Sequence, residues 1–179
     1  MATKVFVDTN IILDLFDNKR PFHKDSVSLY QCVEDNLIEA FISETVLATT
    51  DYILQKILSK NARVLLFTEL IHSFQILPCS NAIFEKAVKS NFEDLEDSIL
   101  YHISLENKLD YFATNDTKAI KNLSSKLLPA MRPRDLLTHL TPNKMLREPS
   151  YAACCDLSLL SSSSAARWAA KNSFVFMAK

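Results

Sequence analysis

Three acidic residues stand where apolar runs of the sequence end or where an amphipathic run begins. Asp8 directly follows the apolar run 5–7, Asp116 closely follows the apolar run 111–113, and Asp97 lies in an acidic stretch that opens an amphipathic run. Carboxylates gathered in one cleft repel each other unless a cation is present. Oxygen ligands favour Mg²⁺ or Mn²⁺ over zinc. Such an ion can activate water for attack on a phosphodiester.

The elements that must position these acids alternate between strands and helices. The sequence predicts strands at 4–7, 38–42, 74–77, 111–114 and, more weakly, 128–131. It predicts helices at 11–16, 24–35, 43–58, 61–73, 81–89 and 95–107, a short helix near Lys118 and a last turn at 135–140. This alternation indicates an α/β fold whose parallel sheet is joined by right-handed crossovers.

The carboxyl ends of parallel strands share one edge of a sheet, where open α/β folds bind ligands. Asp8 and Asp116 are therefore expected to meet there, and Asp97 joins them if the amino end of its helix points to the same crevice. Capping of the next helix is the alternative role for a single such acid. Asp110 precedes its strand, so we expect it at the opposite edge in a structural role.

Length, charge and cysteine content narrow the class of protein. A chain of 179 residues with 48% hydrophobic residues is long enough for one domain with a sizeable core. A net charge of −1 argues against binding nucleic acid through a broad basic surface, although a local basic stretch at 118–134 is either solvated or faces RNA. No apolar stretch is long enough to span a membrane, and the chain start leads straight into a strand, so we expect a cytoplasmic protein. The four cysteines have neither zinc nor disulfide spacing.

Individual polar residues carry further predictions. The chain has no glycine, so Asn and Asp are expected to take the positive-φ positions, and Asp35-Asn36, Asn107 and Asn115 fall where elements should end. Asn107 is expected to be a helix C-cap. Ser43 is expected to cap a helix rather than act as a nucleophile. Asp14 is expected to face solvent or to set up the following turn.

Three segments together resemble the motifs of one family. They are 5–14 (VFVDTNIILD), 94–101 (DLEDSILY) and 110–116 (DYFATND), and 132–137 (RPRDLL) is similar to a weaker terminal motif. They resemble the PIN-domain family, in particular the VapC-like ribonuclease toxins of bacterial toxin-antitoxin pairs. The resemblance covers about residues 2–140. It implies a PIN-like three-layer α/β/α sandwich with a central, mostly parallel sheet of about five strands.

The resemblance also implies a set of site residues and partners. Asp8, Asp97 and Asp116 would be the catalytic ligands of Mg²⁺ or Mn²⁺, with Asn10, Glu96 and Asn115 in supporting positions. The implied substrate is RNA, cut by water attack on phosphorus. The implied partners are a cognate antitoxin that blocks the cleft and a second copy of the chain in a homodimer.

One departure from the family pattern bears on activity. The family often has a Glu on the helix after the second strand, and Thr49 occupies that position here. Glu44, in the first turn of the same helix, is the candidate replacement among the supporting residues. The loss leaves open a second interpretation, a PIN-fold module with a decayed site that binds RNA or protein without cutting.

A phosphotransfer enzyme with Asp8 as nucleophile fits the sequence less well. Haloacid-dehalogenase-like phosphatases have a second Asp two positions on, where this chain has Asn10. A phospho-receiver is a poorer match again, because its acceptor belongs on a middle strand.

The carboxyl-terminal part differs in composition from the rest. Residues 1–140 are expected to form the PIN domain, whereas 141–179 contain the serine run 161–164 flanked by alanine pairs and few acids. This segment is interpreted as a low-complexity tail or a partner-binding extension, with a helix at 164–176 as one form. It is assigned no catalytic role.

Overall fold

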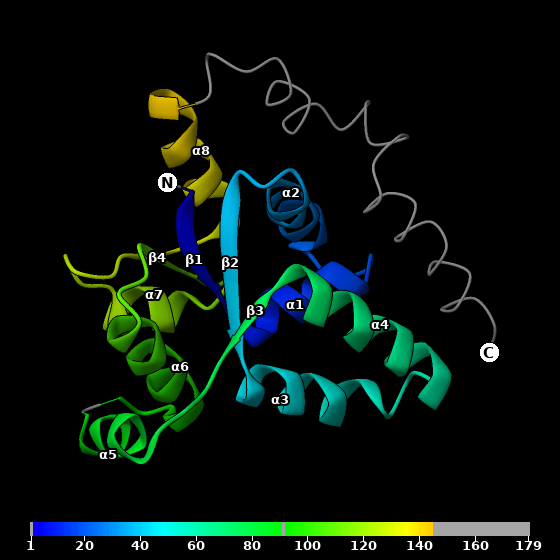
Figure 1. Cartoon of the computed structure of the whole chain (residues 1–179), viewed down its shortest axis with the longest axis horizontal. Helices are drawn as coiled ribbons and strands as arrows, with labels where there is room; N and C mark the ends of the chain where they lie inside the picture. The colour runs from blue at the N-terminus through cyan, green and yellow to red at the C-terminus, as the bar shows by residue number, and fades with distance from the viewer. Residues whose placement is uncertain (1, 91, 145–179) are drawn as a thin grey trace.

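The computed structural model describes residues 2–90 and 92–144 (Figure 1). Its strands are β1 (Thr3–Val7), β2 (Ile38–Ser43), β3 (Gln75–Leu77), β4 (Tyr111–Ala113) and β5 (Ala130–Met131). Its helices are α1 (Thr9–Phe16), α2 (His23–Glu34), α3 (Glu44–Leu54), α4 (Lys60–Ser73), α5 (Asn81–Lys89), α6 (Leu95–Glu106), α7 (Thr117–Leu123) and α8 (Pro133–Lys144). Strands and helices alternate along the chain as the sequence predicts.

The strands form one parallel sheet in the order β3-β2-β1-β4-β5. The chain starts in the centre with β1, moves outward through β2 to β3, and then crosses back to β4 on the other side of β1. Val5 accordingly pairs with Ala40 on one side and with Tyr111 on the other. The order of connection therefore reverses between β1 and β4, and a crevice at their carboxyl ends is where such sheets bind ligands.

Helices cover the sheet on both faces, which confirms the predicted three-layer architecture. Right-handed crossovers place α1–α4 on one face and α5–α7 on the other, because the two sets of connections run in opposite directions across the sheet. The contacts agree, since α1 contacts α2 and α3 whereas α6 contacts α5 and α7. In Figure 1, α5, α6 and α7 gather beside β4, and α2, α3 and α4 lie beyond β2.

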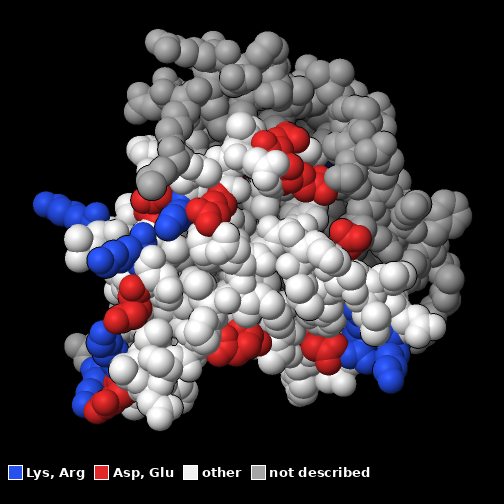
Figure 2. Space-filling model, in the orientation of Figure 1, with Lys and Arg blue, Asp and Glu red and all other residues white. Residues whose placement is uncertain are grey.

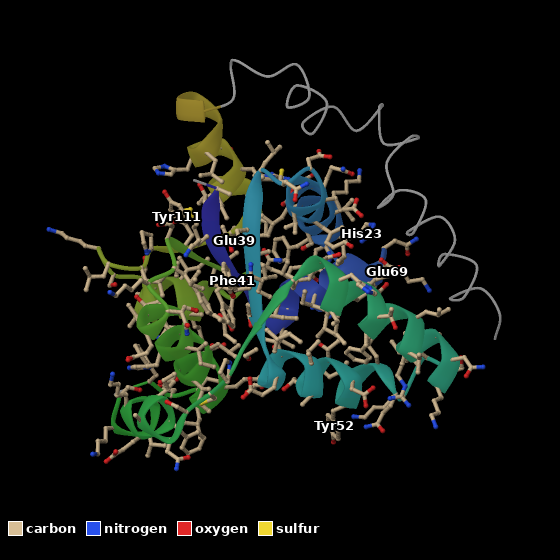
Figure 3. All side chains as sticks on the ribbon, viewed as in Figure 1. His23, Glu39, Phe41, Tyr52, Glu69 and Tyr111 are labelled. Atoms are coloured by element: carbon tan, nitrogen blue, oxygen red, sulfur yellow. The ribbon has the colours of Figure 1, made fainter. Side chains whose placement is uncertain are left out.

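The core lies around the central strands. In β1, Val5, Phe6 and Val7 are all buried, as expected for a strand covered on both faces. The ring of Phe6 stacks on that of Phe112 in β4, with centroids 5.5 Å apart. Figure 3 shows the contrast between Phe41, which lies within the body of the molecule at β2, and Tyr52, which points away from α3.

Two helices end in left-handed residues without glycine. Asn36 has φ 57° after α2, as predicted, and Lys108 has φ 51° after α6. Both helix ends have the paired backbone bonds of a Schellman motif, in which this conformation leaves fewer carbonyls unsatisfied. Asn107 is the C-cap of α6, as predicted, although its φ is not positive, and its side-chain amide donates to the Ile103 carbonyl over 2.8 Å. The expectation of a positive φ at Asn115 is wrong.

Two element ends differ from prediction. Helix α3 ends at Leu54, short of the predicted 58. The backbone tightens there, since the N–H groups of Lys56 and Ile57 donate to the carbonyls three residues back, those of Ile53 and Leu54. The predicted last turn is the full helix α8, which begins at Pro133 and buries Leu136.

The predicted helix 164–176 and the serine run fall outside the described residues. Of the helices in the described ranges, none combines the length and apolar character needed to cross a bilayer.

Candidate functional site

Asp8 occupies the junction between the two strands at which the sheet order reverses. It follows β1 directly and is only 2% exposed. Its N–H donates to the Ala113 carbonyl at the end of β4 over 3.1 Å. Its Oδ2 accepts from Thr114 Oγ1 at 2.8 Å and lies 3.4 Å from Asn10 Nδ2. The carboxylate is therefore held between β1, β4 and the first turn of α1.

Thr114 connects Asp8 to the third acid of the site. Its fully buried hydroxyl donates to Asp8 and accepts from the Asp116 N–H at 3.0 Å. Asp116 itself caps α7, and its Oδ1 accepts from the N–H groups of Lys118 and Ala119. One threonine hydroxyl thus fixes the spacing between the end of β1 and the start of α7.

The amino end of α6 brings Asp97 to the same edge. Asp94 caps this helix by accepting from the N–H groups of Glu96 and Asp97. Thr9 Oγ1, at the start of α1, donates to Glu96 Oε1 at 3.1 Å. This bond joins the start of α1 to the start of α6. The condition stated above for Asp97, that the amino end of its helix points to the crevice of Asp8 and Asp116, is therefore met.

Burial and the neighbouring charge of Glu96 raise the pKa of Asp8 to about 6. Burial is the larger cause, because it penalises the charged form. Hydrogen bonds from the Thr114 hydroxyl, the Asn10 amide and the Thr9 N–H oppose the shift in pKa. The carboxylate is partly compensated by its partners but still carries an unfavourable charge.

The pKa of Asp97 is raised further, to about 7. Burial is again the first cause, and the negative charges of Asp8, Asp94, Asp116 and Glu96 follow in that order. Asp97 therefore lies within electrostatic range of both other acids of the predicted set. This mutual repulsion is the property that a bound cation would relieve.

The donor set fits a hydrated, hard divalent cation. All the candidate ligands are carboxylate oxygens, which Mg²⁺ and Mn²⁺ favour. Over residues 2–90 and 92–144, no three His, Cys, Asp or Glu side chains stand close enough to enclose a metal ion. Mg²⁺ commonly takes only one or two protein carboxylates and keeps several waters. The arrangement suits such an ion and does not suit a closed protein cage.

Glu44 lies apart from the three acids. Its side chain is exposed, and its Oε1 accepts from the Cys79 N–H at 2.8 Å, which joins the start of α3 to the segment after β3. The pKa of the Cys79 thiol is raised mainly by burial and secondarily by the negative charge of Glu44. Glu44 is not among the charges that raise the pKa of Asp97. Thr49 is half-buried in α3.

Of the two expectations for Asp14, exposure to solvent is wrong, whereas its contact with Arg20 in the following turn agrees with the second. Asp14 is 1% exposed, and its Oδ1 accepts from Arg20 Nε at 2.5 Å while its Oδ2 accepts from Asn115 Nδ2 at 2.6 Å. Asn115 therefore braces the segment before Asp116 through Asp14 rather than contacting an acid of the site. Helix α1 is buried on nearly all sides, so an acid within it needs internal partners.

Sequence reasoning also missed Thr9 and Thr114. Thr9 follows the predicted site residue Asp8, and Thr114 follows the end of a strand. A threonine in either position is common and does not by itself predict a contact with a site residue. For Asp14 a signal was present, because it is the one polar residue in the apolar run 11–16.

An open parallel sheet with a cluster of acids at its point of reversal defines an α/β protein with a carboxylate-lined candidate active site. A family model described as PIN domain matches residues 4–118. The chain belongs to the PIN-domain family. Ribonuclease VapC1 of Aquifex aeolicus is 34% identical over 120 residues, which cover 64% of this chain and 83% of that relative.

Solved structures share the fold at lower sequence identity. The VapBC2 structure from Rickettsia felis, bound to a promoter DNA fragment, matches with a TM-score of 0.56 and 14% identity, covering 73% of this chain and 98% of that one. VapC20 of Mycobacterium tuberculosis, a Sarcin-Ricin loop cleaving toxin, matches with a TM-score of 0.53 and 14% identity, covering 64% of this chain and 92% of that one. FitAcB of Neisseria gonorrhoeae matches with a TM-score of 0.50 and 20% identity, covering 73% of this chain and 98% of that one.

Proposed function

We propose that this chain is a Mg²⁺- or Mn²⁺-dependent endoribonuclease that hydrolyses phosphodiester bonds. The observation that carries the proposal is the meeting of Asp8, Asp97 and Asp116 at the switch point of the sheet, where the pKa values of Asp8 and Asp97 are raised. The 34% identity to a protein named Ribonuclease VapC1 supports RNA as the substrate.

Some residues of the site would bind the metal ion, and others would orient the metal ligands. Asp8, Asp97 and Asp116 would hold the ion together through direct oxygen and water-mediated contacts. Thr114 and Asn10 orient Asp8 by donating to the same carboxylate oxygen. A bound divalent ion would lower the pKa of a water molecule and stabilise negative charge on the phosphate.

Incubation of the purified chain with diverse RNAs tests the proposal. We expect cleavage with Mg²⁺ or Mn²⁺ and none after chelation by EDTA. RNAs that stay whole with both metals would instead favour the decayed module that binds without cutting. Thr49 and the outward position of Glu44 are the observations that favour that second candidate.

Metal stabilisation should depend on pH. The folded-state pKa values of about 6 and 7 lie above the ordinary 3.8, so between these values the folded chain holds more protons than the unfolded chain. Without metal, the contribution of these two carboxyl groups to the free energy of unfolding should therefore fall as pH rises from about 4 to about 7. Mn²⁺ needs the deprotonated carboxylates. Thermal unfolding with and without Mn²⁺ should show a larger increase in Tm at pH 8 than at pH 5; an equal increase at both would contradict the assignment.

A toxin of a toxin-antitoxin pair is the biological form of the proposal, with a cognate antitoxin as partner and action in the cytoplasm, where RNA is available. Exposed apolar side chains on α3 and α4, among them Tyr52 (61% exposed) and Leu65 (62%), offer a surface for a protein partner or for a second copy in a homodimer. Figure 2 shows acidic and basic side chains interspersed on the face in view, without a broad basic surface. RNA affinity would then depend on the site itself.

The domain boundaries form part of the proposal. Residues 1–140 would be the PIN domain, and the family match at 4–118 lies within this range. Helix α8 continues to Lys144, so a shortened chain should keep residues up to 144. Residues 141–179 would have no part in metal binding.

A further inference from the structure

A small cavity adjoins the acid cluster on the side of α7. Its volume is about 240 Å³, and Asp97 and Asp116 form part of its wall. Phe92, Ala119 and Leu123 supply apolar lining. Ala119 and Leu123 are buried, so this part of the lining belongs to the packed body of the domain.

Phe92 presents an aromatic ring whose position is fixed by its neighbours. The ring meets Tyr101 at an interplanar angle of 77° and His102 at 61°, with both centroid distances 6.4 Å. Edge-to-face contacts of this kind are favourable aromatic geometries. Phe92 is half-buried and lines the cavity, so part of the ring is available to a ligand.

The polar part of the lining excludes one kind of ligand and favours another. The lining carries the four carboxyl groups of Glu93, Asp94, Asp97 and Asp116 against the single ammonium group of Lys118. The acids outnumber the cation, so the cavity as a whole disfavours a phosphate or a carboxylate. Asn122 offers an amide that both donates and accepts hydrogen bonds. A neutral, flat, hydrogen-bonding group meets these conditions.

The cavity is smaller than the roughly 300–1,000 Å³ typical of sites for drug-sized ligands, so it suits a single ring system. Proteins recognise unpaired RNA bases by stacking them on aromatic side chains and by hydrogen bonding to their edges. We propose that this cavity binds one unpaired nucleobase of the RNA next to the phosphate that is cut, with Phe92 as the stacking residue and Asn122 as the hydrogen-bonding residue. The inference rests on the proposed function and narrows the substrate to RNA with an unstacked base at the cleavage site.

The test compares a labelled single-stranded RNA with an abasic ribose-phosphate oligomer of the same length, by fluorescence anisotropy in Ca²⁺. The full chain should bind the RNA more tightly than the abasic oligomer. Phe92→Ala should weaken RNA binding about tenfold, which corresponds to about 1.4 kcal/mol and lies within the range for base stacking on an aromatic side chain. It should leave binding of the abasic oligomer unchanged. Phe92→Trp, which keeps an aromatic surface, should restore RNA binding.

Phe84→Ala is the matched control, because Phe84 is 46% exposed on α5 and lies away from the cavity lining. It should bind both oligomers as the wild type does. Equal affinity of the wild type for the two oligomers, or equal losses for both in Phe92→Ala, would overturn the base site. Base-dependent binding without any RNA cleavage would uphold the cavity and refute the nuclease proposal. If Phe92→Ala changes neither RNA binding nor cleavage, the nuclease proposal stands and the base site is refuted.

Discussion

Asp97→Asn should reduce Mg²⁺-dependent RNA cleavage by more than about 100-fold, since even the outer partners of metal ligands cost about 10–100-fold when they are replaced. The same variant should be more stable than the wild type in the absence of metal above pH 7. The reason is that Asp97 lies among the negative charges of Asp8, Asp94, Asp116 and Glu96, and a neutral amide removes their repulsion. Cleavage rates and thermal unfolding at pH 8 with EDTA measure the two effects.

Asp135→Asn is the matched control for this variant. Asp135 is an exposed acid in the first turn of α8, outside the candidate site, so the same chemical change should leave cleavage unaltered. Opposite signs for activity and stability are the mark of a functional carboxylate. Asp97→Asn protein that cuts RNA normally, or that is less stable than the wild type without metal, would contradict the role assigned to Asp97.

Asp14→Ala should lower the free energy of unfolding by about 2 kcal/mol, because hydrogen bonds to charged groups contribute about 1.5–3 kcal/mol. The change removes the partner of Asn115 and of Arg20, whose side chain is 37% exposed and can turn to water. Because Asn115 immediately precedes Asp116, cleavage should fall as well. Chemical denaturation monitored by far-UV circular dichroism measures the loss of stability.

Asp17→Ala provides the comparison for Asp14→Ala. Asp17 is half-buried and accepts one backbone hydrogen bond, from the Lys19 N–H at 2.9 Å. Its replacement should cost less than about 1 kcal/mol and should leave cleavage unchanged. Similar losses of stability for the two variants would show that the network around Asp14 has no special role.

The order of the elements and the edge on which the acids meet were predictable from the sequence. Predicted strands of four or five residues alternate with segments of helical periodicity. In a parallel sheet this alternation places Asp8 and Asp116 at one edge and Asp110 at the other. The structure agrees, since Asp110 Oδ2 accepts from the Lys4 N–H near the start of β1.

Side-chain partners that are distant in sequence could not be predicted. Thr114 and Asp8 are 106 residues apart, and Asn115 and Asp14 are 101 residues apart. Their pairing depends on the exact register of β1 against β4, which no local pattern encodes. Lys108 in a left-handed conformation is a similar case, because the geometry of the helix end imposes it against the preference of the residue.

Calorimetric titration with Mn²⁺ at pH 8 tests most directly whether Asp8, Asp97 and Asp116 bind a divalent ion together. The titration compares the wild type with Asp8→Asn, Asp97→Asn, Asp116→Asn and the control Asp135→Asn. We expect saturable binding in the wild type and the control, and binding that is strongly weakened in each of the other three variants. Equal binding in all five proteins, or no binding in the wild type, would contradict the metal site on which the nuclease proposal depends.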